Sequence, residues 1–382
     1  MLPEIMVSAG TAFGIYLHVP FCATRCGYCD FNTYTAAERG DATPDSWTAA
    51  VDAELGRAAA SCGPVPVDTV FVGGGTPSLL GAQRLGAVLD IVAKHFPIAA
   101  GAEITTEANP ESTSPEFFDG IRAAGYTRVS LGMQSLSPRV LAVLDRTHSP
   151  GRAPAAAAEA RAAGFAHVNL DLIYGTPGES DTELLESVDA AVAAGVDHIS
   201  AYALIVEDGT ALARRVRRGE IPAPDDDELA HRYELVDARL TAAGLRWYEV
   251  SNWSRDGAQC RHNLGYWTGG QWWGAGPGAH SFVGDTRWWN VKHPSAYAQR
   301  LSEGVAPVAG FERLDDRDRH VEQVLLGVRL REGIAARALS TSERGRAERA
   351  VAEGLLGVDG ERFVLTDRGR LLADAVVRDI LD

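Results

Sequence analysis

Three cysteines near the amino terminus have the spacing of a metal-binding loop. Cys22, Cys26 and Cys29 are spaced C-x3-C-x2-C, and the apolar run from Gly14 to Val19 leads directly into them. Three thiolates cannot complete an ordinary four-cysteine iron–sulfur site, so one metal position would stay open for a substrate or cofactor. A structural zinc usually has four protein ligands, and no cysteine or histidine is an obvious fourth. Three unrelated loop cysteines are the remaining alternative.

A glycine-rich sequence follows the next apolar segment of the chain. It reads Gly73-Gly74-Gly75-Thr76-Pro77. Glycines without side chains let the backbone approach an anionic or amino-acid ligand closely. Surface turns also use such a sequence, so its meaning depends on its place one strand after the cysteines.

Both motifs belong to a repeating pattern of strands and helices. We expect strands at Phe13–His18, Thr69–Val72, Glu103–Glu107, Arg128–Leu131, His167–Leu172 and His198–Ala203, and helices at Pro44–Ser61, Gly81–His95, Pro115–Ala124, Pro138–Leu144, Ala153–Ala163 and Ser180–Ala194. Such alternation favours parallel strands joined by helical crossovers. Six units are too few for an eight-fold barrel but could form most of one. The chemistry of such a fold lies at the carboxyl ends of the strands.

The sequence predicts three parts. Residues 1–215 form the barrel core, residues 216–317 form an extension with an aromatic and glycine-rich run, and residues 318–382 form a small C-terminal domain of winged-helix-like order. Winged helices often bind DNA, but 51 acidic residues against 36 basic ones give a net charge of -15. Because nucleic-acid binding needs a basic surface, we expect a structural or partner-docking role and no nucleic acid.

The sequence also predicts the cellular location of the protein. Its amino terminus lacks the basic start and apolar core of a signal peptide, and no apolar run approaches the roughly 18 residues of a spanning helix. We therefore expect a cytoplasmic protein, either free or peripheral at the membrane through its partners. Thiols stay reduced there, so its five cysteines point to metal binding or catalysis more than to disulfides.

The cysteine spacing resembles that of the radical S-adenosylmethionine (SAM) superfamily. This resemblance implies a [4Fe-4S] cluster bound by Cys22, Cys26 and Cys29, with SAM on the fourth iron, and an α/β fold with a partial (β/α)6, TIM-like barrel. Electron transfer to SAM in this superfamily releases a 5′-deoxyadenosyl radical. The segments IYLHVPFC, GGGTPS, TEANPES, GMQS and DLIYGTPGE are similar to one branch, which contains oxygen-independent coproporphyrinogen III oxidases and haem chaperones.

The same resemblance implies which residues contact SAM. They are Tyr16, Tyr28, Gly74, Gly75, Thr76, Glu107, Gln134, Arg146, Asp171 and Ala203. From the residues alone, Glu107 and Asp171 could instead cap loops, and Arg146 could belong to a surface ion pair.

Two features separate the chaperones from the oxidases in this branch. The oxidases carry a fourth cysteine two positions after the third, where this chain has Phe31. Residues His262 to Trp267 match the HNxxYW motif of the chaperones. The resemblance thus implies a haem-binding protein that transfers haem to acceptor haemoproteins, with membrane respiratory enzymes as candidate acceptors. A coproporphyrinogen III oxidase, or a radical SAM enzyme with another substrate, is the alternative. SAM cleavage stays open, as does the choice between a monomer and a cluster-dependent dimer.

His262 is the candidate haem ligand, because imidazole suits iron. Five of the eight tryptophans follow it closely, at positions 267, 272, 273, 288 and 289, and could stack on a porphyrin. Alternatively these aromatic side chains close the barrel core and His262 is a structural histidine. Cys260 is a second candidate ligand, and His280 is a candidate contact near SAM.

Overall fold

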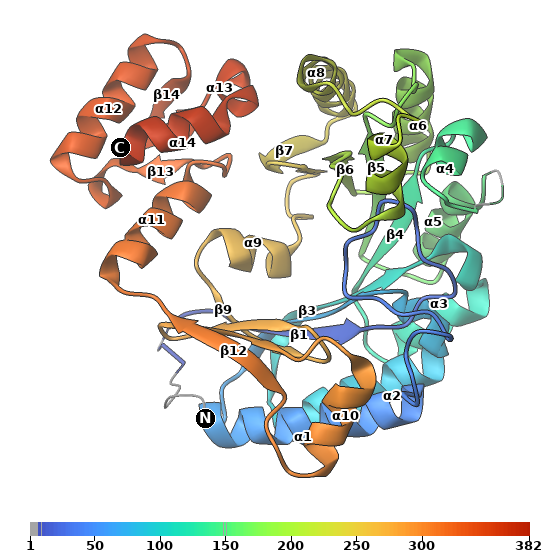
Figure 1. The fold of residues 1–382 in the computed structure, drawn as a ribbon. Helices are drawn as coiled ribbons and strands as arrows, with labels where there is room; N and C mark the ends of the chain where they lie inside the picture. Colours follow the sequence, from blue (N-terminus) through green and yellow to red (C-terminus); the bar gives the residue numbers. More distant parts are fainter. Residues whose placement is uncertain (1–6, 9, 148, 150) are drawn as a thin grey trace.

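A single twelve-stranded sheet forms the centre of the computed structural model, which describes residues 7–8, 10–147, 149 and 151–382 (Figure 1). The strand order is β12-β11-β10-β9-β1-β2-β3-β4-β5-β6-β8-β7. The expectation about a signal peptide falls partly on residues 1–6, which lie outside the described residues.

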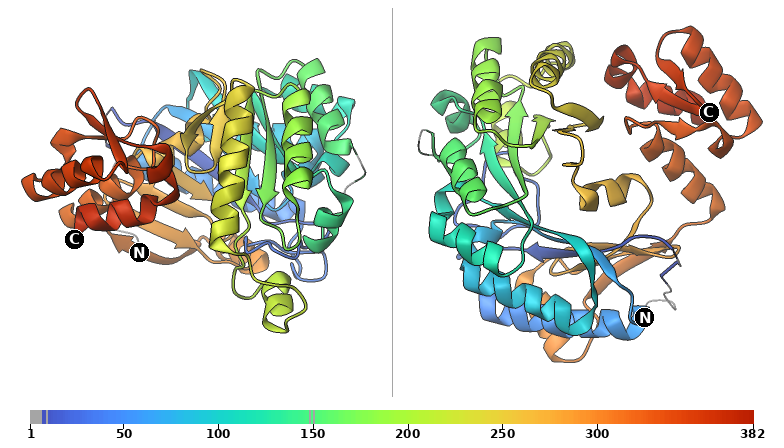
Figure 2. Two further views of the ribbon diagram at one scale, coloured as in Figure 1. Left: turned by 90° about the horizontal axis from the view of Figure 1, so that it is seen from above. Right: turned by 180° about the vertical axis from the view of Figure 1, so that it is seen from behind.

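Six consecutive parallel strands build the barrel. They are β1 (Phe13–Val19), β2 (Val67–Gly74), β3 (Ile98–Ala108), β4 (Arg128–Gln134), β5 (His167–Tyr174) and β6 (His198–Ala203). The helices α1 (Pro44–Cys62), α2 (Gly81–His95), α3 (Pro115–Ala123), α4 (Pro138–Val143), α5 (Arg152–Ala162) and α6 (Asp181–Ala193) alternate with them and cover the outer face (Figure 2). The predicted partial (β/α)6 barrel is confirmed.

Local sequence signals fix the ends of several helices. Ser114 and Ser137 cap α3 and α4 by accepting backbone N–H groups, and a proline follows each serine. Gly125 and Gly164 follow α3 and α5 with φ angles of 110° and 85°, a backbone region that favours glycine. These ends direct the chain back into the next strand.

The sheet continues beyond the six barrel strands on both sides. β9 (Gln271–Ala275) pairs in parallel with β1, followed by the antiparallel strands β10 (His280–Val283), β11 (Thr286–Asn290) and β12 (Val308–Arg313). β8 (Asn252–Ser254) and β7 (Arg246–Glu249) extend the other edge. Because β12 and β7 do not pair with each other, the sheet stays open. The sequence analysis assigned no strands to the aromatic run.

Helices of the extension complete this part of the molecule. They are α7 (Ala211–Arg217), α8 (Asp226–Ala242), α9 (Arg261–Trp267) and α10 (Pro294–Ser302). In both views of the barrel α9 lies on the concave side of the sheet, between the β9 and β7 edges (Figures 1 and 2). It carries the HNxxYW motif into the interior.

The C-terminal residues form a separate apolar core. α11 (Asp316–Gly327), α12 (Thr341–Ala352), α13 (Asp367–Leu371) and α14 (Ala373–Leu381) surround a small sheet of order β13-β15-β14, at Ile334–Ala335, Arg362–Leu365 and Leu356–Asp359. Val324, Phe363 and Val377 belong to its apolar cluster, which is distinct from that of the barrel. This order matches the predicted winged-helix-like arrangement; the boundaries at residues 215 and 317 stay predictions.

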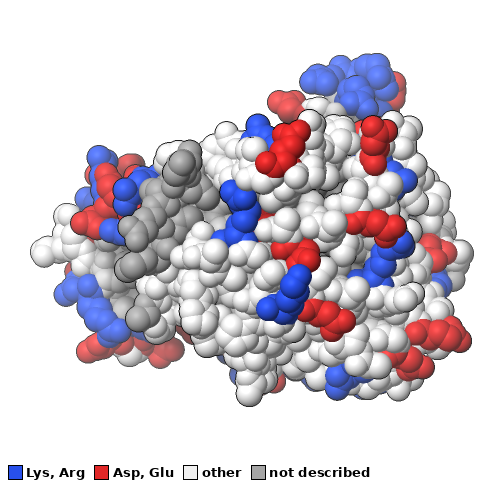
Figure 3. All heavy atoms as spheres, turned by 90° about the horizontal axis from the view of Figure 1, so that it is seen from below, with Lys and Arg blue, Asp and Glu red and all other residues white. Residues whose placement is uncertain are grey.

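The surface carries both signs of charge. On the face seen from below, groups of acidic and basic side chains alternate, and among its described residues no broad basic area covers the face (Figure 3). A separate finding concerns the helices of the described chain, none of which is long and apolar enough to cross a membrane.

Candidate functional site

The three cysteines lie in the loop between β1 and α1, at the carboxyl end of β1. All three side chains are partly buried. The Thr76 hydroxyl, in the loop after β2, lies 3.6 Å from the Cys22 sulfur, and the Arg146 guanidinium lies 3.2 Å from the Cys26 sulfur. Two loops from different strands therefore meet at the thiols.

Backbone hydrogen bonds hold the middle of the cysteine loop. The Gly27 N–H donates to Leu144 O at 3.1 Å, and the Leu212 N–H donates to Gly27 O at 2.8 Å. Gly27 is thus bound on one side by the end of α4 and on the other by α7. Tyr28 packs into the small apolar cluster that Leu144 and Leu212 share. These contacts orient the segment between Cys26 and Cys29.

The thiols fit an iron–sulfur cluster by their chemistry. Burial, with a smaller contribution from repulsion by the Cys26 and Cys22 thiolates, raises the pKa of Cys29 to about 11. A cationic metal core would relieve that repulsion and hold all three as thiolates. Among the described residues no three His, Cys, Asp or Glu side chains are already arranged as a metal site.

The glycine loop after β2 packs against the cysteine loop through the backbone. The Gly75 N–H donates to Val19 O at 2.7 Å, and the Thr76 N–H donates to Phe21 O at 2.8 Å. A Cβ at Gly75 would lie 2.6 Å from Phe21 O, so this close approach requires glycine. Gly74 has a φ of 109°, and its N–H donates to the Glu107 carboxylate at 2.9 Å.

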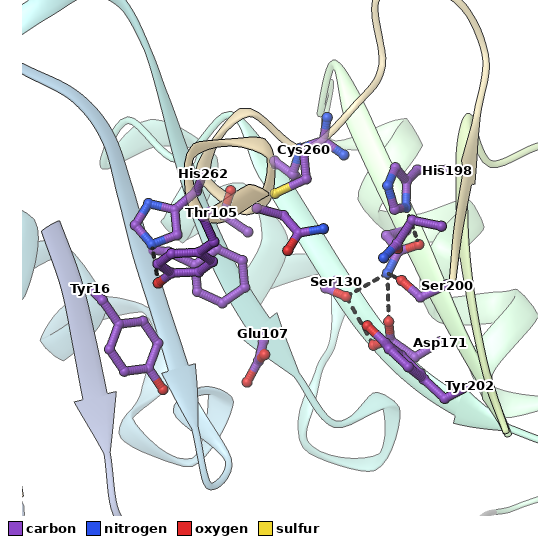
Figure 4. A pocket seen from close by; sticks show the side chains of 16 residues that line it. Tyr16, Thr105, Glu107, Ser130, Asp171, His198, Ser200, Tyr202, Cys260 and His262 are labelled. Carbon is purple, nitrogen blue, oxygen red and sulfur yellow. Dashed lines mark hydrogen bonds between the residues drawn. The ribbon is translucent and has the colours of Figure 1, made fainter. Parts of the chain in front are cut away.

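Two carboxylates face one cavity of about 250 Å³ inside the barrel (Figure 4). Glu107 lies near the end of β3 and Asp171 in the second half of β5. Burial, together with the negative charge of Asp171, raises the pKa of Glu107 to about 8. Burial also raises the pKa of Asp171, against hydrogen bonds from Ser130, Ser200 and Asn169. A ligand with a positive group would relieve this repulsion, so the cavity suits a cation.

A polar network lines the β5 and β6 side of the cavity. The Asn169 side-chain amide donates to Ser130 at 2.7 Å, to Asp171 at 2.7 Å and to Ser200 at 3.0 Å. His198 pairs through its ring nitrogens with the Asn169 carbonyl at 2.6 Å and the Tyr248 hydroxyl at 2.8 Å. Of this network, the sequence analysis identified Asp171 alone. Polar residues at every second position of β5 and β6 were the available signal, because alternate residues of a strand share one face.

The remaining residues assigned to SAM fall into two groups. Tyr16 lines the cavity from β1, and its hydroxyl lies 3.0 Å from His18 Nδ1. Gln134 ends β4 with a φ of 65°, and its side chain and that of Arg146 both lie beside Gly132. Ala203 is the last residue of β6. The structure therefore brings Tyr16, Glu107 and Asp171 together inside the barrel, and Gly74, Gly75, Thr76 and Arg146 beside the cysteines.

His262 is buried, and both of its ring nitrogens have partners. Its Nδ1 lies 2.7 Å from the Thr69 hydroxyl and its Nε2 lies 2.8 Å from the Tyr266 hydroxyl. Burial lowers the pKa of His262 to about 4, so the ring is neutral. Iron ligation would require the loss of one of these hydrogen bonds. The role of His262 as a haem ligand stays a prediction. Its two hydrogen bonds match the alternative that it is a structural histidine.

A buried ion pair anchors the start of α9. The Glu103 carboxylate accepts from Arg128 Nε at 3.0 Å, from the His262 N–H at 3.0 Å and from the Cys260 thiol at 3.5 Å. Burial and the Glu103 charge raise the pKa of Cys260 to about 12. The protonated, hydrogen-bonded thiol is a poor iron ligand. His280, in contrast, is exposed at the start of β10.

The comparisons with known proteins follow the same division of the chain. Residues 16–191 match the radical SAM superfamily and residues 314–372 match the HemN C-terminal domain. The chain is 68% identical over 380 residues to the haem chaperone HemW of Mycobacterium tuberculosis (strain H37Rv), covering 100% of this chain and 97% of the relative. It is 34% identical to the haem chaperone HemW of Escherichia coli (strain K12) over 370 residues, covering 95% and 96%.

A solved structure shares the fold. Coproporphyrinogen III oxidase (HemN) from Escherichia coli, a radical SAM enzyme, has a TM-score of 0.83 and 21% identity, and the match covers 97% of this chain and 90% of that chain. At this identity the likeness concerns the fold alone. It covers the C-terminal domain as well as the barrel.

Proposed function

This chain belongs to the HemW family of the radical SAM superfamily, and from that premise we propose that it is a haem chaperone. It binds a [4Fe-4S] cluster and SAM, and it passes haem to acceptor haemoproteins, among them membrane respiratory enzymes. The observation that carries the proposal is the 68% identity to a haem chaperone over the whole chain.

The residues of the barrel have separate roles in this proposal. Cys22, Cys26 and Cys29 would hold the cluster, which would supply an iron site for SAM and one-electron redox chemistry beside it. The backbone of Gly74 and Gly75 approaches the methionine end of SAM, together with Thr76. Tyr16, Glu107 and Asp171 line the cavity wall. The two carboxylates would attract the positive charge of the ligand. The remaining residues proposed to contact SAM are Tyr28, Gln134, Arg146 and Ala203.

Phe31 argues against the oxidase alternative. It occupies the position of the fourth cysteine of the oxidases, and 63% of it is exposed. A phenyl ring offers no sulfur for electron transfer or proton transfer at that position. The shared fold with HemN does not restore this group. The chaperone therefore remains the function that the residues support.

Haem transfer tests the proposal directly. The full-length protein should bind haem with a shift of the Soret band, keep it through gel filtration, and release it to an apo-haemoprotein. In parallel, Cys22→Ser, Cys26→Ser and Cys29→Ser should each abolish iron binding and the brown absorption at about 400–420 nm. Cys62→Ser, at the end of α1, is the matched control and should keep both.

The oxidase assay supplies the contrary outcome. Anaerobic protein with its cluster, SAM, a reductant and coproporphyrinogen III should form no protoporphyrinogen IX. Multiple turnovers to that product would refute the chaperone assignment, as would a failure of the reconstituted protein to bind haem.

A further inference from the structure

The aromatic run of the extension divides between the two faces of its sheet. Trp273 and Trp288 are buried in the barrel core with ring centroids 4.9 Å apart. Trp272 pairs across the strands with Phe282, and Trp289 pairs with His280. Directly paired residues share a face of an antiparallel sheet, and His280 and Phe282 share one because they are two apart on β10. The aromatic side chains thus serve both as a core and as a separate surface.

That second surface continues the concave face of the barrel. Gly14 of β1 pairs with Trp272, and Tyr16, which lines the barrel cavity, pairs with Gly274. The Tyr266 ring of α9 packs against Trp272 at 4.6 Å. The surface of Trp272, His280 and Trp289 therefore lies next to the cavity, with α9 beside it.

His280 has the properties of an iron ligand. It is exposed, and the hydrogen bonds within the described chain include none to its ring nitrogens. Its ring stacks on Trp289 with centroids 5.8 Å apart and an angle of 25°. An imidazole with an open ring nitrogen can bind iron.

The neighbours of His280 suit an anionic ligand. Trp289 packs against Gly310 of β12, where a Cβ would come within 2.6 Å of its ring. Lys292 is exposed and makes no ion pair within the described chain. Arg287 is already bound to Glu312 and Glu322 at 2.9 Å and 2.8 Å. Lys292 is therefore the cation available to a carboxylate.

We propose that haem binds at this surface, with His280 as an axial ligand and Lys292 at a propionate, while Trp289 packs beside the His280 ring and holds its orientation. This inference rests on the proposed chaperone function and specifies its haem site. Two observations argue against haem binding inside the barrel. The cavity has a volume of about 250 Å³, which is smaller than the roughly 300–1,000 Å³ of sites for drug-sized molecules. In the proposed function its lining residues already bind SAM. His262 has both ring nitrogens engaged.

Haem titration of four full-length proteins tests the site. His280→Ala should weaken ferric haem binding at least about tenfold, or roughly 1.4 kcal/mol, and should change the Soret band. His280→Met should restore binding with a different spectrum, because a thioether replaces the imidazole. His262→Ala should keep the wild-type Soret position. His231→Ala is the matched control, because His231 is an exposed histidine on α8. Thermal unfolding measurements check that each variant folds.

Lys292→Glu tests the propionate contact separately. It should weaken binding of haem but leave binding of haem dimethyl ester unchanged, because the ester has no carboxylates. Equal losses for both ligands would contradict the charge contact.

The outcomes distinguish this inference from the function on which it rests. If the wild-type protein binds haem while His280→Ala binds it equally with an unchanged spectrum, the site is wrong and the chaperone proposal stands. A spectral change in His262→Ala alone would return the ligand role to His262. If the wild-type protein binds no haem, both proposals fail.

Discussion

Replacing Glu103 with alanine should destabilise the protein strongly. Glu103 and Arg128 form a buried pair, with 5% and 2% of their side chains exposed. The substitution leaves the Arg128 charge with only the carbonyl oxygens of Ala258 and Gln259, and it removes the acceptor of the His262 N–H. Breaking a buried ion pair typically costs about 3–5 kcal/mol. We expect the free energy of unfolding to fall by that amount.

Urea denaturation followed by tryptophan fluorescence and by circular dichroism measures this loss. The midpoint should fall while the slope stays constant. Arg84→Ala is the matched control, because the Arg84–Asp45 pair is exposed and such pairs contribute about 0–1 kcal/mol. The double variant with Glu103→Leu and Arg128→Met should recover part of the loss, since apolar residues can replace a buried pair. A loss below about 1 kcal/mol for Glu103→Ala would refute the reasoning.

Three further substitutions test the glycine loop, a carboxylate and the C-terminal contact. Gly75→Ala should weaken SAM binding in calorimetry because its Cβ would meet backbone atoms, while Gly345→Ala, with open space around it, should not; equal affinities would contradict this. Glu107 has a pKa of about 8 against about 4.3 unfolded. The folded protein therefore holds a proton that the unfolded chain loses between these values, and stability falls by up to about 1.4 kcal/mol per pH unit as the pH rises. Glu107→Gln should flatten this slope in urea titrations of the cofactor-free protein from about pH 5 to about pH 8, and parallel slopes would count against the shift. Arg370→Ala removes a contact to Asp237 at 2.8 and 2.6 Å and should speed proteolysis of the C-terminal domain, whereas unchanged cleavage would show that other contacts hold it.

The parallel half of the fold could be predicted because its signals are local. Each strand is a short apolar run, and each helix has its own caps, such as Ser114 before α3 and Gly125 after it. The strands β9 to β12 gave no such signal. They have only 4 to 6 residues, and Trp272 and Trp273 form one aromatic run although they face opposite sides. Pairing with a distant strand, not local preference, decides their structure.

The candidate site divides in the same way. The cysteine spacing and the glycine loop are visible in the sequence, because each lies within a few residues. The surroundings of His262 are not visible, since Thr69 and Glu103 come from strands far away in the chain. A histidine motif alone therefore cannot distinguish a ligand from a structural residue. His280 lies outside the motif, and its features are also invisible in the sequence. Its exposure and its contact with Trp289 depend on the pairing of β10 and β11.

In the proposed arrangement, α9 separates the SAM cavity from the haem surface. His262 and Tyr266 line the cavity, while Tyr266 packs against Trp272 on the other side. Loss of the His262 ring would loosen α9 toward both sites, so His262→Ala would lower the affinity for SAM and for haem together without changing the iron spectrum. Loss of His280 would affect haem alone. Reduced haem binding by a variant of the motif is therefore no proof of ligation, and only the spectrum of the bound iron separates the two roles.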